Sequence, residues 1–202
     1  MTGAFTADLR RCVDIDHTRP ALLQLFSENY GLHALLAYRL GRWLLRAGRR
    51  YYLWPLLPCG WLLYLLLSRL ARAIFDIRLE LSADIGPGFY IGHFGAIRVR
   101  HCRIGADCSM GRLTNIMPAA AGAGPDIGDR VWIGAHAQIV GAYRIGSGAT
   151  IAAGAVVQRD VPPGALCLGN PARVVIPNYD NRGILGLGSK RQARPDLGGA
   201  RG

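Results

Sequence analysis

The sequence predicts a mainly β protein: a parallel β-helix built from six-residue repeats and preceded by an α-helical region. Two observations carry this prediction. An aliphatic residue recurs every six residues between residues 85 and 157, whereas residues 21–50 and 61–75 have the composition and spacing of helices. A period of six fits neither an α-helix (3.6) nor a flat amphipathic strand (2.0). It is typical of a prism in which each unit supplies one short strand and one corner, and three units close one coil.

The repeat positions predict which side chains fill the prism. They are Ile85, Ile91, Ile97, Ile104, Met110, Ile116, Ile127, Ile133, Ile139, Ile145, Ile151 and Val157. Grouped in threes, they predict four coils. One extra residue interrupts the period between 97 and 104, and five interrupt it between 116 and 127. Since extra residues cannot enter a packed prism, we expect 118–126 to form an exposed loop between the second and third coils.

The change of pattern along the chain predicts three parts. Residues 1–79 form an N-terminal helical region, and residues 80–177 form the β-helix domain. Residues 178–202 are rich in Gly and Arg and show no periodicity. We therefore expect this basic tail to be disordered.

The helical region combines amphipathic and uniformly apolar stretches. Residues 21–50 predict an amphipathic helix or helix pair, and residues 61–75 predict a second helix. The uncharged run 51–67 is short for a bilayer span and contains two prolines and a glycine, so no complete transmembrane helix is expected. The segment 54–75 holds too many apolar residues for one helix on one prism end. We expect other subunits or a membrane surface to cover it.

Charge is concentrated at the two ends of the chain. The net charge is +11, with eleven arginines against five acidic residues in 1–79, and five basic against two acidic residues in 178–202. Such an excess favours an anionic partner, whether nucleic acid, lipid headgroups or a phosphorylated cofactor. The arginines are scattered and no recognition motif accompanies them, so we expect no nucleic-acid partner.

The five cysteines lack C-x-x-C spacing, and the polar N-terminus shows no cleavable signal sequence. A reduced, cytoplasmic protein is therefore expected, with peripheral association at the inner face of the membrane as an open alternative. Cys102 and Cys108 are six residues apart and occupy equivalent repeat positions. We predict that they pack in the core and neither bind a metal nor form a disulfide.

Three stretches resemble the hexapeptide-repeat acyltransferases, and more narrowly the serine acetyltransferase group with its relatives that acetylate exopolysaccharides of the colanic acid type. They are YGLHALLAYRLGRWL (30–44), IGPGFYIGHFGAIRV (85–99) and GAVVQRDVPPGALCLGNPARVV (154–175), within a likeness that covers about residues 20–177. The resemblance implies a left-handed β-helix, assembled as a homotrimer or a dimer of trimers. It also implies acetyl-CoA as the acyl donor and no metal.

His93 is the candidate general base. Acetyl transfer to a hydroxyl needs a group of near-neutral pKa to take the proton, and His93 stands at a corner two residues after Ile91. No cysteine stands in a motif for a covalent acyl intermediate, which favours direct transfer. His101 is the reserve candidate.

The resemblance also assigns cofactor contacts. It places Ala135 and Ala153, one coil apart, along the pantetheine arm of CoA. It places Gln158, Arg159 and Arg173 at the closing coil, where the two arginines would pair with CoA phosphates.

The resemblance implies that the acceptor is a hydroxyl. Serine acetyltransferases place an Asp before the catalytic His and carry an Arg-His-Pro segment after the loop. This chain has Gly92 and Gly124-Pro125-Asp126 instead. We therefore expect a sugar or exopolysaccharide precursor, with serine as the alternative. Two other classes stay open: a non-catalytic β-helix scaffold, and a γ-class carbonic anhydrase, for which His93, His101 and His136 lack the spacing of zinc ligands.

Overall fold

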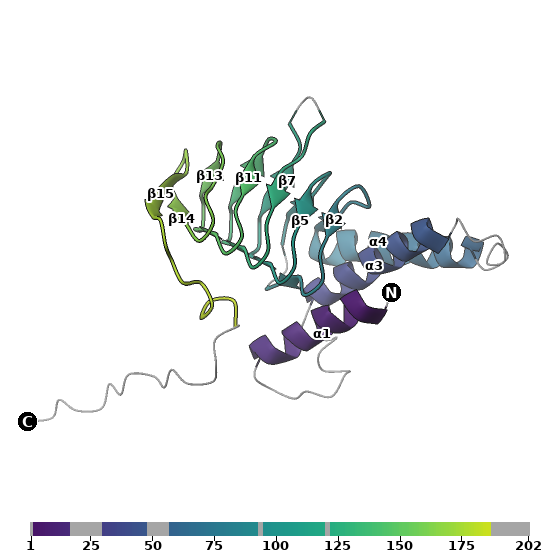
Figure 1. Cartoon of the computed structure of the whole chain (residues 1–202). Helices are drawn as coiled ribbons and strands as arrows, with labels where there is room; N and C mark the ends of the chain where they lie inside the picture. Colours follow the sequence, from purple (N-terminus) through teal and green to yellow (C-terminus); the bar gives the residue numbers. More distant parts are fainter. Residues whose placement is uncertain (1, 17–29, 48–56, 93–94, 120–121, 187–202) are drawn as a thin grey trace, which may run out of the picture.

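In the computed structural model, three helices of the described residues precede a triangular solenoid (Figure 1). The structure describes residues 2–16, 30–47, 57–92, 95–119 and 122–186. The helices are α1 (Thr2–Asp16), α3 (Tyr30–Ala47) and α4 (Leu57–Phe75). Sequence analysis predicted α3 and most of α4, which begins four residues earlier than expected, near its proline. It assigned residues 1–79 to a helical region but located no individual helix at α1.

The solenoid consists of three sheets, one on each face of the prism. Sheet A contains β1 (Ile77–Leu79), β4 (Ile97–Val99), β7 (Asn115–Met117), β10 (Gln138–Val140) and β13 (Val156–Val157). Sheet B contains β2 (Asp84–Ile85), β5 (Arg103–Ile104), β8 (Asp126–Ile127) and β11 (Arg144–Ile145). Sheet C contains β3 (Tyr90–Ile91), β6 (Ser109–Met110), β9 (Trp132–Ile133), β12 (Thr150–Ile151), β14 (Leu166–Leu168) and β15 (Arg173–Ile176).

The chain visits the sheets in the order A, B, C, so that successive coils pair strand on strand. Every pairing between named strands is parallel except that of β14 with β15, where the chain turns back on itself at the end of the prism. The predicted parallel β-helix is therefore confirmed.

The predicted number of coils is wrong, because non-repeat residues add turns at both ends. Sheet A has five strands, and its first strand begins at Ile77, before the predicted domain boundary at residue 80. At the other end Val161 bridges Ile145 on sheet B, and Cys167 on β14 pairs with Ile151. The prism thus makes about five turns and starts at residue 77.

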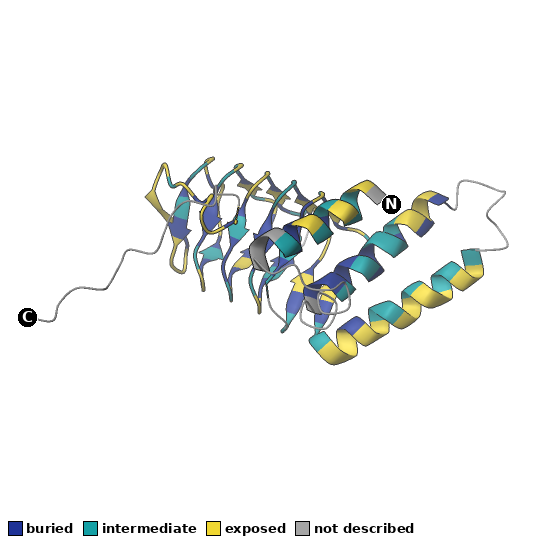
Figure 2. Cartoon of the chain, turned by 90° about the horizontal axis from the view of Figure 1, so that it is seen from below, coloured by how far each residue is buried: buried dark blue, intermediate teal, exposed yellow. Residues whose placement is uncertain are grey.

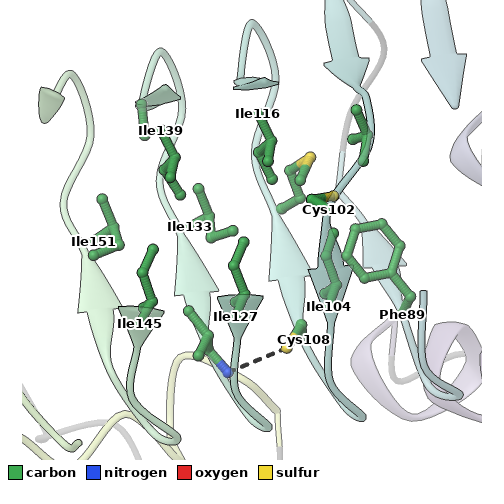
Figure 3. Close-up of a cluster of buried hydrophobic side chains, with 14 of the residues drawn as sticks. Phe89, Cys102, Ile104, Cys108, Ile116, Ile127, Ile133, Ile139, Ile145 and Ile151 are labelled. Carbon is green, nitrogen blue, oxygen red and sulfur yellow. Dashed lines mark hydrogen bonds between the residues drawn. The ribbon is translucent and has the colours of Figure 1, made fainter. Parts of the chain in front are cut away.

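The core is a ladder of aliphatic side chains along the prism axis (Figure 3). All twelve predicted repeat positions are buried. A second inward column lies two residues before most of them and includes Phe89, Cys102, Cys108 and Val131. Both cysteines are buried in the core, as predicted, and both are free thiols. Burial raises the pKa of Cys102 to about 12 and that of Cys108 to about 11.

The loop at 118–126 projects from the corner between β7 and β8, where Figure 1 shows a hairpin extending beyond the prism. Gly122 and Ala123 are exposed, and the Ala119 N–H donates to the Ala123 carbonyl over 2.8 Å. This part of the prediction is confirmed. The end of the loop differs from it, because Pro125 is buried where the chain re-enters sheet B.

The expected disorder from residue 178 is wrong for residues 178–186, which pack along the solenoid. The Tyr179 N–H donates to the Gly164 carbonyl over 2.7 Å, and Leu185 is fully buried. Asn181 is also buried, and its Nδ2 donates to the carbonyls of Arg130 and Gly148 over 3.0 Å each. The segment thus ties three coils together. Residues 187–202 lie outside the described residues.

Two of the helices close the first coil. Tyr38 on α3 is buried, and its hydroxyl donates to the Ala83 carbonyl over 2.8 Å. Asp8 on α1, with no exposed surface, pairs with Arg39 at 3.0 Å and accepts the Phe89 N–H. Because a buried carboxylate needs such partners, this network fixes α1 and α3 against the solenoid. In Figure 2, α4 lies outside α3, with much of its surface exposed.

Candidate active site

A groove of about 450 Å³ runs along the corner between sheets C and A. We call it the corner groove. It crosses four coils and is formed by Tyr90, Gly92, Ser109, Met110, Gly111, Arg112, Trp132, Ala135, Ala153 and Ile184.

The floor of the corner groove consists of small residues in register. Because Ile91, Met110, Ile133 and Ile151 pair in that order across sheet C, the residues that follow them stack from coil to coil. A β-carbon built at Gly111 would lie 2.6 Å from the Ala135 nitrogen. Only glycine allows the coils to approach this closely.

Main-chain groups line this floor. The Ala135 carbonyl accepts the Gly154 N–H over 2.8 Å, one coil along. Within the described part of the chain, the N–H groups of Ala135 and Ala153 donate to no acceptor. Two backbone donors, one coil apart, are therefore available to an elongated ligand in the groove.

The walls of the corner groove come from distant parts of the sequence. Tyr90 and Trp132 face outward from β3 and β9, and Ile184 comes from the C-terminal segment. Arg11 on α1 is buried and donates to Ser109 Oγ over 3.0 Å. Burial lowers the pKa of Arg11, and Asp107 at 3.4 Å opposes that change. Both the N-terminal helix and the C-terminal segment thus shape the groove.

The structure brings together some of the predicted site residues. Ala135 and Ala153 both line the corner groove, as does Gly92. His93 follows Gly92 in the chain but lies outside the described residues. A β-carbon at Gly92 would meet no atom closer than 3.4 Å, so the backbone does not require glycine at this position.

The other predicted cofactor residues lie elsewhere. Gln158 and Arg159 are exposed at the corner that follows β13, between sheets A and B. Arg173 is exposed at the start of β15, opposite Leu168 in the last coil. In one subunit, therefore, these three side chains do not line the corner groove.

The remaining histidines of the described chain also lie outside the groove lining. His33 packs its ring 5.7 Å from that of Phe75, as a structural residue would. His101 is exposed at the corner between sheets A and B, where its N–H donates to Ser82 Oγ. His136 is exposed beside Ala135, and its N–H donates to the Arg112 carbonyl. Among the described residues, no group of three His, Cys, Asp or Glu could hold a metal ion.

Sequence reasoning missed several groove residues for which a signal existed. Arg112 follows Met110 by two residues, as Ala135 follows Ile133, so the register places both at the same corner. Tyr90 and Trp132 each precede an inward residue and therefore face outward on sheet C. Nothing in the sequence pattern signals Ile184.

Comparisons with known proteins agree with this architecture. Residues 124–159 match the family described as "Bacterial transferase hexapeptide (six repeats)". Serine acetyltransferase of Helicobacter pylori (strain 26695) is 34% identical over 149 residues, covering 72% of this chain and 81% of that enzyme. The Escherichia coli K12 enzyme is 35% identical over 149 residues. There the match covers 72% of this chain and 50% of the enzyme, so the chain spans about half its length.

Solved structures show the same likeness. Soybean serine acetyltransferase complexed with serine superimposes with a TM-score of 0.69 at 31% identity, covering 85% of this chain and 68% of that one. The Brucella abortus enzyme in complex with coenzyme A gives 0.67 at 25% identity, covering 85% and 66%. With its repeats, its solenoid and these relatives, the chain belongs to the serine acetyltransferase-like group of hexapeptide-repeat acyltransferases.

Proposed function

We propose that this protein is an acetyl-CoA-dependent O-acetyltransferase in which His93 is the general base. The observation that carries the proposal is the corner groove, which joins Gly92, the residue before His93, to Ala135 and Ala153. The general base and the residues that contact the pantetheine arm would then lie along the same groove. The coenzyme A complex of the Brucella abortus relative supports the choice of donor.

The transfer proceeds directly between the two substrates. The His93 imidazole takes the proton of the acceptor hydroxyl as its oxygen attacks the thioester carbonyl carbon. The tetrahedral intermediate then collapses, the C–S bond breaks, and the CoA sulfur leaves with the proton from the imidazolium. No covalent acyl-enzyme intermediate forms. Burial keeps the thiols of Cys102 and Cys108 in the core, unsuited to nucleophilic attack.

The coenzyme lies along the corner groove. The free N–H groups of Ala135 and Ala153 suit the amide carbonyls of the pantetheine arm, and their small side chains leave room for it. Arg173, in the last coil, would pair with the phosphates at the far end of the cofactor.

A homotrimer, alone or as a dimer of trimers, completes the site. If sheet A of each prism is nearest the threefold axis, each subunit presents its C–A corner to one neighbour and its A–B corner to the other. Gln158 and Arg159, at the A–B corner, would then face the groove of the neighbouring subunit. This arrangement explains why they lie away from the groove of their own chain. A protein that light scattering shows to be a monomer, and that has full activity, would contradict this arrangement.

Different observations favour two acceptors. The named relatives are serine acetyltransferases, and Arg112 in the groove suits a carboxylate such as that of serine. Tyr90 and Trp132 offer aromatic surface for a sugar ring, and this chain lacks the Asp-His and Arg-His-Pro pattern of the serine enzymes. Release of CoA thiol should be followed with serine, homoserine and nucleotide sugars. An Arg112→Gln protein that loses serine turnover selectively would assign the amino-acid acceptor.

The test of the proposal is His93→Asn, with His101→Asn as the matched control. Loss of the base should lower kcat by roughly two to four orders of magnitude. Thermal stability and CoA binding should stay unchanged, because the prism core does not depend on a corner residue. Near-normal turnover in a folded His93→Asn protein would refute the assignment. Failure of the unaltered protein to bind CoA would favour the scaffold interpretation.

A further inference from the structure

The outward face of α4 carries six large apolar side chains that the described part of the chain leaves exposed. They are Leu62, Leu63, Leu65, Leu66, Leu70 and Ile74, with exposed fractions between 43% and 69%. Figure 2 shows α4 as the outermost helix, exposed along its length. Monomeric soluble proteins rarely show an apolar strip of this kind unless it meets a partner.

The opposite face of α4 is held tightly against the rest of the molecule. A β-carbon built at Gly60 would lie 2.6 Å from Leu44 Cδ2, and one built at Gly41 would lie 2.7 Å from Tyr64 Cε2. Ala71 is buried in the solenoid core cluster. By length and composition α4 could cross a membrane. It cannot do so here without giving up these contacts, so it presents its apolar strip sideways.

The charges around the strip select the partner. Helix α4 contains two arginines and no acidic residue. Arg69 and Arg72 are exposed on α4, among the apolar residues of the strip, and Arg46 is exposed at the end of α3. Packing a second copy on this strip would bring like charges together. A membrane surface offers an apolar layer in which the leucines can be buried and anionic headgroups with which the arginines can pair.

We propose that α4 docks the protein on an anionic membrane surface, lying in the plane of the interface. The leucine strip enters the boundary between headgroups and acyl chains, and Arg69 and Arg72 extend to the phosphates.

Sedimentation of the full chain with lipid vesicles tests the proposal. The protein should bind vesicles of phosphatidylcholine that contain phosphatidylglycerol, and raised salt should weaken that binding. The double variant Leu62→Gln/Leu66→Gln should lower the partition coefficient at least roughly tenfold. The variant Arg69→Gln/Arg72→Gln should lower it roughly thirtyfold on anionic vesicles and little on pure phosphatidylcholine.

Matched controls remove two exposed apolar side chains or two charges from the solenoid: Leu168→Gln/Val175→Gln and Arg103→Gln/Arg144→Gln. All four residues are exposed, and both controls should bind as the unaltered protein does. Two results would each overturn the proposal: the unaltered protein does not bind vesicles, or the test and control variants lose equal amounts of vesicle binding. A third would be that Leu62→Gln/Leu66→Gln changes the oligomeric state and leaves vesicle binding unchanged. The last would assign the strip to a second copy of the chain.

Discussion

Replacing Asn181 by Ala should release the C-terminal segment 178–186 from the solenoid without unfolding the prism. Asn181 is the main polar anchor of this segment, since its Nδ2 donates to carbonyls of two successive coils: Arg130 and Gly148 at 3.0 Å and Ala149 at 3.3 Å. None of the contacts involves the aliphatic ladder. The loss should therefore be local.

The magnitude follows from the number of hydrogen bonds. An amide nitrogen has two N–H groups, so the three contacts amount to about two full hydrogen bonds. At roughly 1 kcal/mol each, their loss favours the detached form by about 2 kcal/mol. Because 1.4 kcal/mol corresponds to about tenfold, the detached population should rise about thirtyfold. The remaining anchors, Tyr179 and Leu185, are unchanged.

Limited trypsin digestion measures this population. Arg182 is exposed as a side chain, but cleavage after it requires the flanking backbone to leave the solenoid. When opening is fast relative to cleavage, the rate follows the detached fraction. Release of the peptide that begins at residue 183, followed by mass spectrometry, should accelerate about thirtyfold in Asn181→Ala. It should not change in Asn178→Ala, whose side chain is exposed. Equal rates in both variants would refute the anchoring role.

Three further predictions concern the proposed site and the thiols. Arg173→Ala should raise KM for acetyl-CoA and largely spare kcat, because a phosphate remote from the reacting carbon is held alike in ground and transition states; an unchanged KM would make Arg173 an ordinary surface residue. Gly92→Asp should fold, because a β-carbon there meets no atom closer than 3.4 Å. The new carboxylate should stabilise the charged form of His93 and raise the pKa of His93, so the acidic limb of the kcat/KM profile should move to higher pH. If that limb does not move, residue 92 does not interact with the base. Only Cys59 is exposed among the cysteines, and burial raises the pKa of Cys108 to about 11. One thiol should therefore react rapidly with a disulfide reagent at about pH 8. A rapidly reacting thiol that is still present in Cys59→Ser would contradict this.

The periodic part of the fold could be predicted because its cause is local. Each coil must bury one aliphatic side chain per face, so the pattern repeats wherever the prism continues. The same rule placed Cys102 and Cys108 in the core, and the structure confirms it. It failed at the ends, where Ile77 and Val161 extend the prism without keeping the six-residue step.

The non-periodic segments could not be placed, because their positions depend on partners far away in the sequence. Disorder was expected from residue 178, and Asn181 instead binds the carbonyl of Arg130. Likewise α1 carries no strong pattern, yet its Asp8 pairs with Arg39 in the buried network that closes the first coil. A polar residue shows such a role only when its partner is known.

The sequence by itself determined the prism, its core and the column that holds Ala135 and Ala153, since a separation of eighteen residues is one coil. Only the tertiary structure decided which corner of the prism forms the groove, because one of its walls comes from Ile184, in a segment without periodicity. Gln158 and Arg159 lie at the A–B corner, and Ala153 lies at the C–A corner, although the three are close in the chain. The physical reason is the geometry of the coil: each six-residue unit turns the chain by one face of the triangle, so a few residues along the sequence move a side chain to a different edge of the prism.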